Sequence, residues 1–131
     1  MIFVDTSGWF AGFVPSDSDH SLASEWFLSN NDQLVTTDYV IDETLTLFRA
    51  RGEHKRAMFL ADRFFEGDLT EVIYLTKDDI KESISIFKQF ADKSWSFTDC
   101  SSKYICEKYG ITHALSFDRH FHQFGTVTVV P

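Results

Sequence analysis

Short apolar runs that alternate with longer segments of helical spacing are the feature that most constrains the fold of this sequence. Runs typical of β-strands occur at IFV (2–4), LVTT (34–37), EVIYL (71–75), ITHALSF (111–117) and TVTVV (126–130). Most are apolar on both faces, which is typical of strands covered by helices on both sides. The sequence therefore predicts an α/β fold: a three-layer α/β/α sandwich around a central, mainly parallel sheet of about five strands.

The segments between these runs predict helices. Helical spacing is found over 21–29, 39–51, 53–67, 76–92 and 97–109, with a short helical turn at 118–124. In the fourth of these helices, Ile80, Ile84 and Phe87 form one apolar stripe. At the start of the fifth, Ser96 and Asp99 have the spacing of a capping box.

Length and composition indicate one compact domain over residues 1–131, because 131 residues with 44% apolar content suffice for a single core. No apolar run approaches the roughly 18 residues that would cross a bilayer. The N-terminus lacks the basic region of a signal peptide, so we expect a cytoplasmic protein without a membrane segment. Cys100 and Cys106 are predicted to be reduced core thiols, and the histidines lack the spacing of a zinc site.

Charge is distributed unevenly along the chain. The net charge of −8 argues against a surface that binds nucleic acid over its whole extent, because phosphate contacts need Lys and Arg. Residues 1–48 contain eight acids and no Lys or Arg, whereas residues 49–63 carry five bases and two acids. Any basic contact surface is therefore expected in the second of these segments.

Acidic residues fall where a parallel sheet would gather them. Asp5 and Asp118 each directly follow a predicted strand, and the carboxyl ends of parallel strands share one edge. The helix that begins near Asp99 precedes the strand before Asp118, so its first turn should lie at that edge too. Glu43 lies at the border of the buried face of its helix, whereas Asp42 points further toward solvent. Each acid could equally be a helix cap or a surface residue.

Carboxylates that converge in one crevice would repel each other unless a cation neutralised them. Oxygen ligands without Cys or His favour Mg²⁺ or Mn²⁺, which commonly act on phosphate groups. A metal-held water would then attack a phosphodiester in line. The hydroxyls of Thr6, Ser7 and Thr98 could hold a water or a phosphate oxygen, although such residues are more often helix caps.

Four segments together resemble a PIN domain, and are most similar to VapC-type toxins of prokaryotic toxin–antitoxin modules. They are VDTSGW (4–9), the helix around Glu43, FTDC (97–100) and LSFDRHF (115–121), and the resemblance spans nearly the whole chain. It implies a metal-dependent endoribonuclease whose acidic pocket is formed by Asp5, Glu43, Asp99 and Asp118, with Thr6 or Ser7 and Thr98 as supporting hydroxyls. It also implies a homodimer and a cognate antitoxin that blocks the pocket.

If RNA binds, five basic residues are the expected phosphate contacts, although a solvated helix face is an equally good interpretation. They are Arg49, Arg51, Lys55, Arg56 and Arg119.

Two other functions remain open. Asp5 could be the nucleophile of an aspartyl-phosphate enzyme, but VDTSG lacks the second acid of a DxDxT motif, and no family lysine is evident. Alternatively, the chain could be a non-catalytic PIN-like binding module whose acids only cap helices. The complete acidic set argues against that second alternative, since a lost activity usually frees such positions to change.

Overall fold

The sheet is built from five short parallel strands. A computed structural model describes residues 1–131. The strands are β1 (Ile2–Val4), β2 (Leu34–Thr37), β3 (Glu71–Ile73), β4 (His113–Leu115) and β5 (Thr128–Val130). Their order is β3-β2-β1-β4-β5, and every neighbouring pair is parallel. The five predicted strands are therefore confirmed, and the sheet is parallel throughout.

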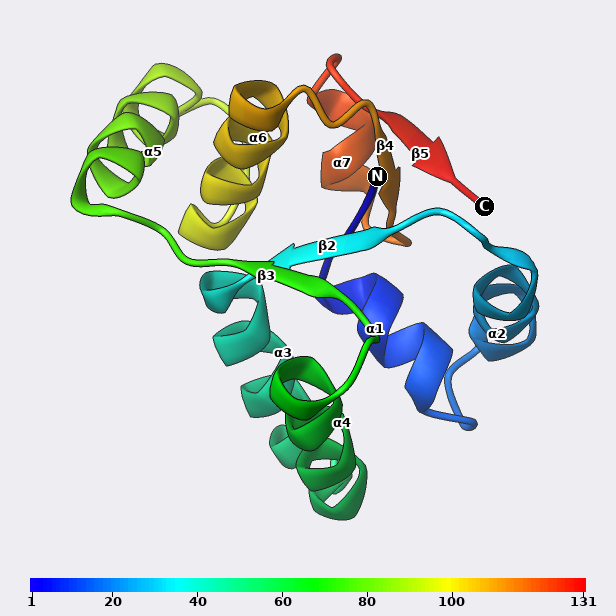
Figure 1. Cartoon of the computed structure of the whole chain (residues 1–131). Coiled ribbons are helices and arrows are strands. Elements are labelled where there is room, and N and C mark those ends of the chain that lie inside the picture. Colours follow the sequence, from blue (N-terminus) through cyan, green and yellow to red (C-terminus); the bar gives the residue numbers. More distant parts are fainter.

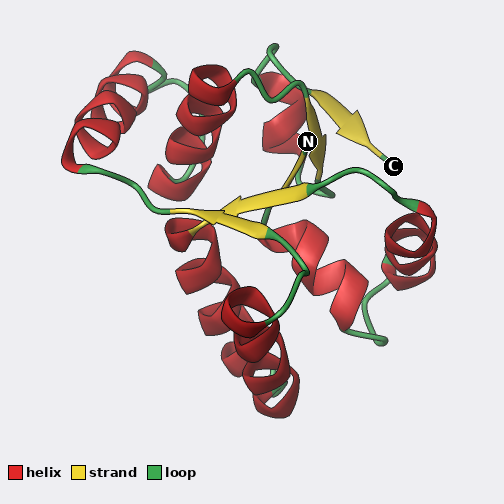
Figure 2. Ribbon diagram, viewed as in Figure 1, coloured by secondary structure: helices red, strands yellow, loops and turns green.

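Helices cover both faces of this sheet. They are α1 (Thr6–Phe13), α2 (His20–Ser29), α3 (Asp38–Ala50), α4 (His54–Glu66), α5 (Lys77–Gln89), α6 (Phe97–Tyr109) and α7 (Arg119–Gln123). Figure 1 shows α1, α3 and α4 on one side of the strands and α5, α6 and α7 on the other, and the layers are seen by element type in Figure 2. The predicted three-layer α/β/α sandwich is confirmed. None of these helices is long and apolar enough to cross a membrane.

The core lies around the central strand. All residues of β1 and β2 are buried, whereas the edge strands β3 and β5 are partly exposed. Trp9 and Phe48 from one helical layer and Phe121 from the other are fully buried, and the ring of Phe121 stacks on that of Phe3 of β1. Burial of such large apolar side chains provides most of the stabilisation of the fold. Cys100 and Cys106 are buried free thiols, as predicted.

Helix α1 was not predicted from the sequence. It contains Gly8 and Gly12, which weaken the local signal for a helix. Packing explains both glycines. A Cβ atom at Gly8 would lie 2.7 Å from the carbonyl oxygen of Leu115, and one at Gly12 would lie 2.3 Å from the ring of Phe27. Close contact with β4 and α2 therefore stabilises a helix whose own residues favour it only weakly.

The apolar stripe of α5 is largely exposed. Ile84 and Phe87 are 39% and 50% exposed, Ile80 is half-buried, and the fully buried positions of this helix are Asp79 and Ser83. The Asp79 carboxylate accepts a hydrogen bond of 2.7 Å from the ammonium of Lys108, so a polar contact joins α5 to α6.

The start of α6 agrees with the sequence prediction. Ser96 is the N-cap, its hydroxyl accepts the backbone N–H of Asp99, and the Asp99 carboxylate accepts the backbone N–H of Ser96. The helix ends at Gly110, which has a left-handed conformation with φ of 65°. The capping box therefore fixes Asp99 in the first turn of α6.

Candidate active site

A cavity of about 270 Å³ lies at the carboxyl edge of the sheet. It contains all seven side chains predicted for the site: Asp5, Thr6, Ser7, Glu43, Thr98, Asp99 and Asp118. The other lining residues are Val40, Leu47, Ser102 and Phe121. The chain leaves β1 toward β2 on one face and enters β4 from the opposite face, so this edge is a switch point where parallel sheets bind ligands. Topology thus brings together acids that are distant in the sequence.

Asp5 is the most buried of the four acids. It follows β1 and caps α1: its Oδ1 accepts the backbone N–H of Gly8 and the hydroxyl of Ser7, each at 2.8 Å. Its Oδ2 accepts the hydroxyl of Ser116 at 2.7 Å. Burial raises the pKa of Asp5 to about 7, although these three hydrogen bonds oppose the shift; the charge of Asp118 raises it further. In the protein without a cation, this carboxyl group holds a proton close to neutral pH.

Glu43 enters the cavity from the second turn of α3. It is half-buried, whereas Asp42 beside it is exposed, as the helical geometry predicted. Burial raises the pKa of Glu43 above its usual value; the hydroxyls of Thr6 and Thr98 lower it, and the charges of Asp99 and Asp118 raise it. The carboxylates from α3, α6 and the start of α7 therefore influence one another electrostatically.

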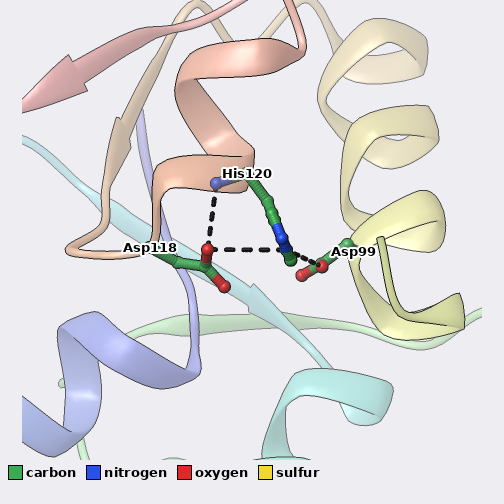
Figure 3. A group of neighbouring side chains, drawn as sticks. All are labelled: Asp99, Asp118 and His120. Carbon is green, nitrogen blue, oxygen red and sulfur yellow. Dashed lines mark hydrogen bonds and ion pairs between the residues drawn. The ribbon is translucent and has the colours of Figure 1, made fainter. Parts of the chain in front are cut away.

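Asp99 and Asp118 are joined through His120, as Figure 3 shows. The Nδ1 atom of His120 lies 2.8 Å from Oδ2 of Asp99 and 3.5 Å from Oδ1 of Asp118. The backbone N–H of His120 also donates to Oδ1 of Asp118 at 2.9 Å, which makes Asp118 the cap of α7. On Asp99, Ser96 and His120 both donate to Oδ2, and Oδ1 has no protein donor. One oxygen of Asp99 is therefore available to a ligand.

The sequence prediction missed two residues that touch the site. His120 contacts Asp99 and Asp118, although no histidine was among the predicted site residues. Ser116 bridges Asp5 and the backbone N–H of Asp118 through its hydroxyl. The position of His120 two residues after a helix-capping acid was a usable signal in the FDRHF segment. Nothing in the sequence around Ser116 distinguished it from an ordinary strand residue.

The three predicted hydroxyl groups have different contacts. Ser7 donates to Asp5 and accepts the backbone N–H of Phe117 at 2.8 Å, so it joins α1 to the segment after β4. The hydroxyl of Thr6 lies 3.3 Å from that of Thr44 on α3. Thr6 and Thr98 both lie near Glu43.

The basic residues predicted to contact RNA are all exposed, and none lines the cavity. They are Arg49, Arg51, Lys55, Arg56 and Arg119. Four of them surround the turn between α3 and α4, two helices that extend away from the sheet in Figure 1. Arg56 is paired with Glu53 at 2.8 Å. Arg119 directly follows Asp118. Their contact with RNA stays a prediction.

The composition of the cavity fits a hard divalent cation. Its ligand atoms are carboxylate and hydroxyl oxygens, the donors that Mg²⁺ and Mn²⁺ prefer. Ligand atoms of Asp99, Asp118 and His120 lie within 4.8 Å of one another, close enough for one ion to contact several of them. Four acids and no Lys or Arg line the cavity, so a bound cation would offset the repulsion between its ionised carboxylates.

Comparisons with known proteins identify similar chains of nearly the same length. The "23S rRNA-specific endonuclease VapC20" of Mycobacterium tuberculosis is 32% identical over 131 residues, which cover 100% of this chain and 99% of that protein. The crystal structure of that VapC20, described as a sarcin–ricin loop cleaving toxin, superposes with a TM-score of 0.93 at 30% identity and full coverage of both chains.

A more distant structure shares the fold alone. FitAcB from Neisseria gonorrhoeae superposes with a TM-score of 0.70 at 14% identity, over 100% of this chain and 97% of that one. The family model described as "PIN domain" matches residues 2–127. The resemblance inferred from the sequence segments is thus confirmed, and the chain belongs to the PIN domain family.

Proposed function

We propose that this chain is a Mg²⁺- or Mn²⁺-dependent endoribonuclease and the toxin of a type II toxin–antitoxin pair. One observation carries the proposal: a single cavity gathers four carboxylates from four separate parts of the chain, at the sheet edge where ligands bind. The full-length similarity to an rRNA-specific endonuclease supports the choice of reaction.

The residues of the cavity would have different roles in phosphodiester hydrolysis. Asp5, Glu43, Asp99 and Asp118 would hold the cation, which when bound would polarise a phosphate oxygen and favour the attack of water. Glu43 is half-buried and its pKa is raised, so it is the carboxylate best suited to accept a proton from the attacking water. Thr6 and Thr98, beside Glu43, would orient that water. Ser7 would act by holding Asp5 in place.

The RNA substrate is proposed to be ribosomal. The related M. tuberculosis toxin is named for 23S rRNA, and its crystal structure is described for the sarcin–ricin loop. Phosphates on the two sides of the cut would be contacted by Arg119, which is adjacent to Asp118, and by the four basic residues around the α3–α4 turn. These contacts would offset the net charge of −8, so binding should weaken steeply with added salt.

Removal of divalent cations should abolish cleavage. Purified protein treated with EDTA is expected to leave 23S rRNA intact, and excess Mg²⁺ or Mn²⁺ should restore specific fragments, because the acids alone supply no positive charge to the phosphate. Fragments are read on a denaturing gel. Cleavage that persists in EDTA, or no cleavage of any RNA with either cation, would contradict the proposal.

The chain is also proposed to form a homodimer, with the exposed stripe of α5 in the interface. Phe87 is half-exposed and packs edge-on against Phe97 with a centroid distance of 6.0 Å, and Ile84 extends the same apolar surface. An isologous contact between two copies would cover this surface.

Phe87→Glu should therefore convert the dimer to a monomer. We expect light scattering after size exclusion to give twice the 15.1 kDa chain mass for the wild type and the single mass for the variant. Gln89→Glu, which adds the same charge at an exposed position of α5, should remain dimeric. A wild-type protein that is monomeric at micromolar concentration would rule out this interface.

The proposed partner that controls the activity is a cognate antitoxin that covers the cavity, and both proteins are placed in the cytoplasm, where the RNA is. A short neighbouring gene that encodes a small DNA-binding protein would support this pairing.

The two alternative functions fit the cavity less well. Both carboxylate oxygens of Asp5 already accept hydrogen bonds and the residue is only 5% exposed, which makes it a poor nucleophile toward phosphorus. A binding module whose acids only cap helices would not need Glu43, which lies in the second turn of α3 and caps nothing.

A further inference from the structure

Ser102 is the one buried side chain of the protein whose polar atom has no hydrogen-bond partner. The residue is 1% exposed and lines the acidic cavity. It lies three residues after Asp99 on α6, so the two side chains share a face of the helix. A buried hydroxyl without a partner is costly, and native proteins generally satisfy such groups with a ligand or an ordered water.

The other fully buried helical serines differ from Ser102 in this respect. Ser83 on α5 donates to the carbonyl oxygen of Asp79, and Ser101 donates to that of Thr98, each at 2.7 Å. This bond to the preceding helical turn is the usual way for a buried serine to satisfy its hydroxyl. Ser102 makes no such bond, although it belongs to the same helix as Ser101.

The depth of Ser102 in the cavity limits what it can contact. Helix α6 begins at the carboxyl edge of the sheet, so Ser102 lies one turn further from that edge than Asp99. The apolar residues that line the same cavity are Val40, Leu47 and Phe121, which offer no hydrogen bond from their side chains. A side chain that is only 1% exposed suits a small ligand such as water better than a nucleotide.

We propose that the Ser102 hydroxyl is a positioning group for the divalent cation, and that it hydrogen-bonds a water that the cation retains. Mg²⁺ and Mn²⁺ usually keep several waters in protein sites, and groups that orient such waters affect metal affinity strongly. Ser102 would thus add a hydroxyl from the second turn of α6 to the cation site. This inference rests on the proposed function, since it assumes the cation site.

The test is a calorimetric titration of Mn²⁺ into metal-free protein, combined with thermal unfolding in EDTA. Ser102→Ala should raise the dissociation constant for Mn²⁺ about 10-fold. The same variant should keep or raise the unfolding temperature of the metal-free protein, because it removes a buried group that has no partner. Replacement of a serine with only a structural role would leave the Mn²⁺ affinity unchanged and lower the unfolding temperature of the metal-free protein.

Ser83→Ala is the matched control, since Ser83 is a fully buried helical serine remote from the cavity. It should lower the unfolding temperature by about 3 °C through its lost hydrogen bond and leave the Mn²⁺ affinity unchanged. Equal Mn²⁺ affinity of Ser102→Ala and wild type would overturn the inference while the proposed function stands. A wild type that binds no Mn²⁺ would overturn the proposed function, and the inference with it.

Discussion

Asp99→Asn should lower the rate of RNA cleavage by at least about 10³-fold, because loss of a charged ligand removes several kcal/mol of transition-state stabilisation. The fold should survive the change. The asparagine carbonyl oxygen can accept the backbone N–H of Ser96 and the Nδ1–H of His120, which both bond one oxygen of Asp99. We expect a stability loss of about 0.5–1 kcal/mol from the missing charge at the helix start. Cleavage rates and urea unfolding measure the two effects.

Asp79→Asn provides the control for a purely capping acid. Asp79 occupies the same position in the capping box of α5 that Asp99 occupies in α6, and it is also buried, but it lies outside the cavity. Its replacement weakens the bond to Lys108, so we expect a stability loss of about 1–2 kcal/mol with unchanged cleavage. If Asp99→Asn behaved in this way too, Asp99 would be a cap and the assignment of the site would fail.

Asp5→Asn is expected to abolish cleavage and to remove a pH-dependent loss of stability from the metal-free protein. Burial raises the pKa of Asp5 from 3.8 to about 7, so between these pH values the folded protein holds a proton that the unfolded chain has released. The stability from this proton is fully present below pH 4 and is lost as the pH rises through 7. The neutral asparagine avoids that loss, which is about 4 kcal/mol by pH 8.

Urea unfolding in EDTA at pH 5 and pH 8 measures this effect. The wild type should lose more stability than Asp5→Asn between the two pH values, and saturating Mn²⁺ should restore the wild type at pH 8 by binding the ionised carboxylate. Asp42→Asn removes the same charge from an exposed position of α3 and should follow the wild type. Equal losses of stability by Asp5→Asn and the wild type between pH 5 and pH 8 would contradict the raised pKa of Asp5.

Local sequence signals were sufficient for most of the fold. The apolar strands, the capping box at Ser96 and the stop at Gly110 act through neighbouring residues, and the structure has all of them. Helix α1 depends on contacts of its glycines with β4 and α2, which no local pattern contains. The polar contact between α5 and α6 joins Asp79 to Lys108, which lies 29 positions away in the sequence.

The cavity was predictable as far as topology determines it. Strand ends placed Asp5 and Asp118 at one edge, and the capping box placed Asp99 beside them. The contact of His120 with Asp99 and the bridge made by Ser116 depend on side-chain conformations and on how α7 packs against α6. Such contacts need the three-dimensional structure, as does the unpaired hydroxyl of Ser102. The roles of all these residues in catalysis stay predictions.

The central claim is that the four carboxylates of the cavity hold a divalent cation. Calorimetric titration of Mn²⁺ into the metal-free wild type and into Asp99→Asn tests it most directly. Saturable binding by the wild type that is lost or weakened at least about 10-fold in the variant is the predicted result. Absence of binding by the wild type, or equal binding by both proteins, would contradict the claim.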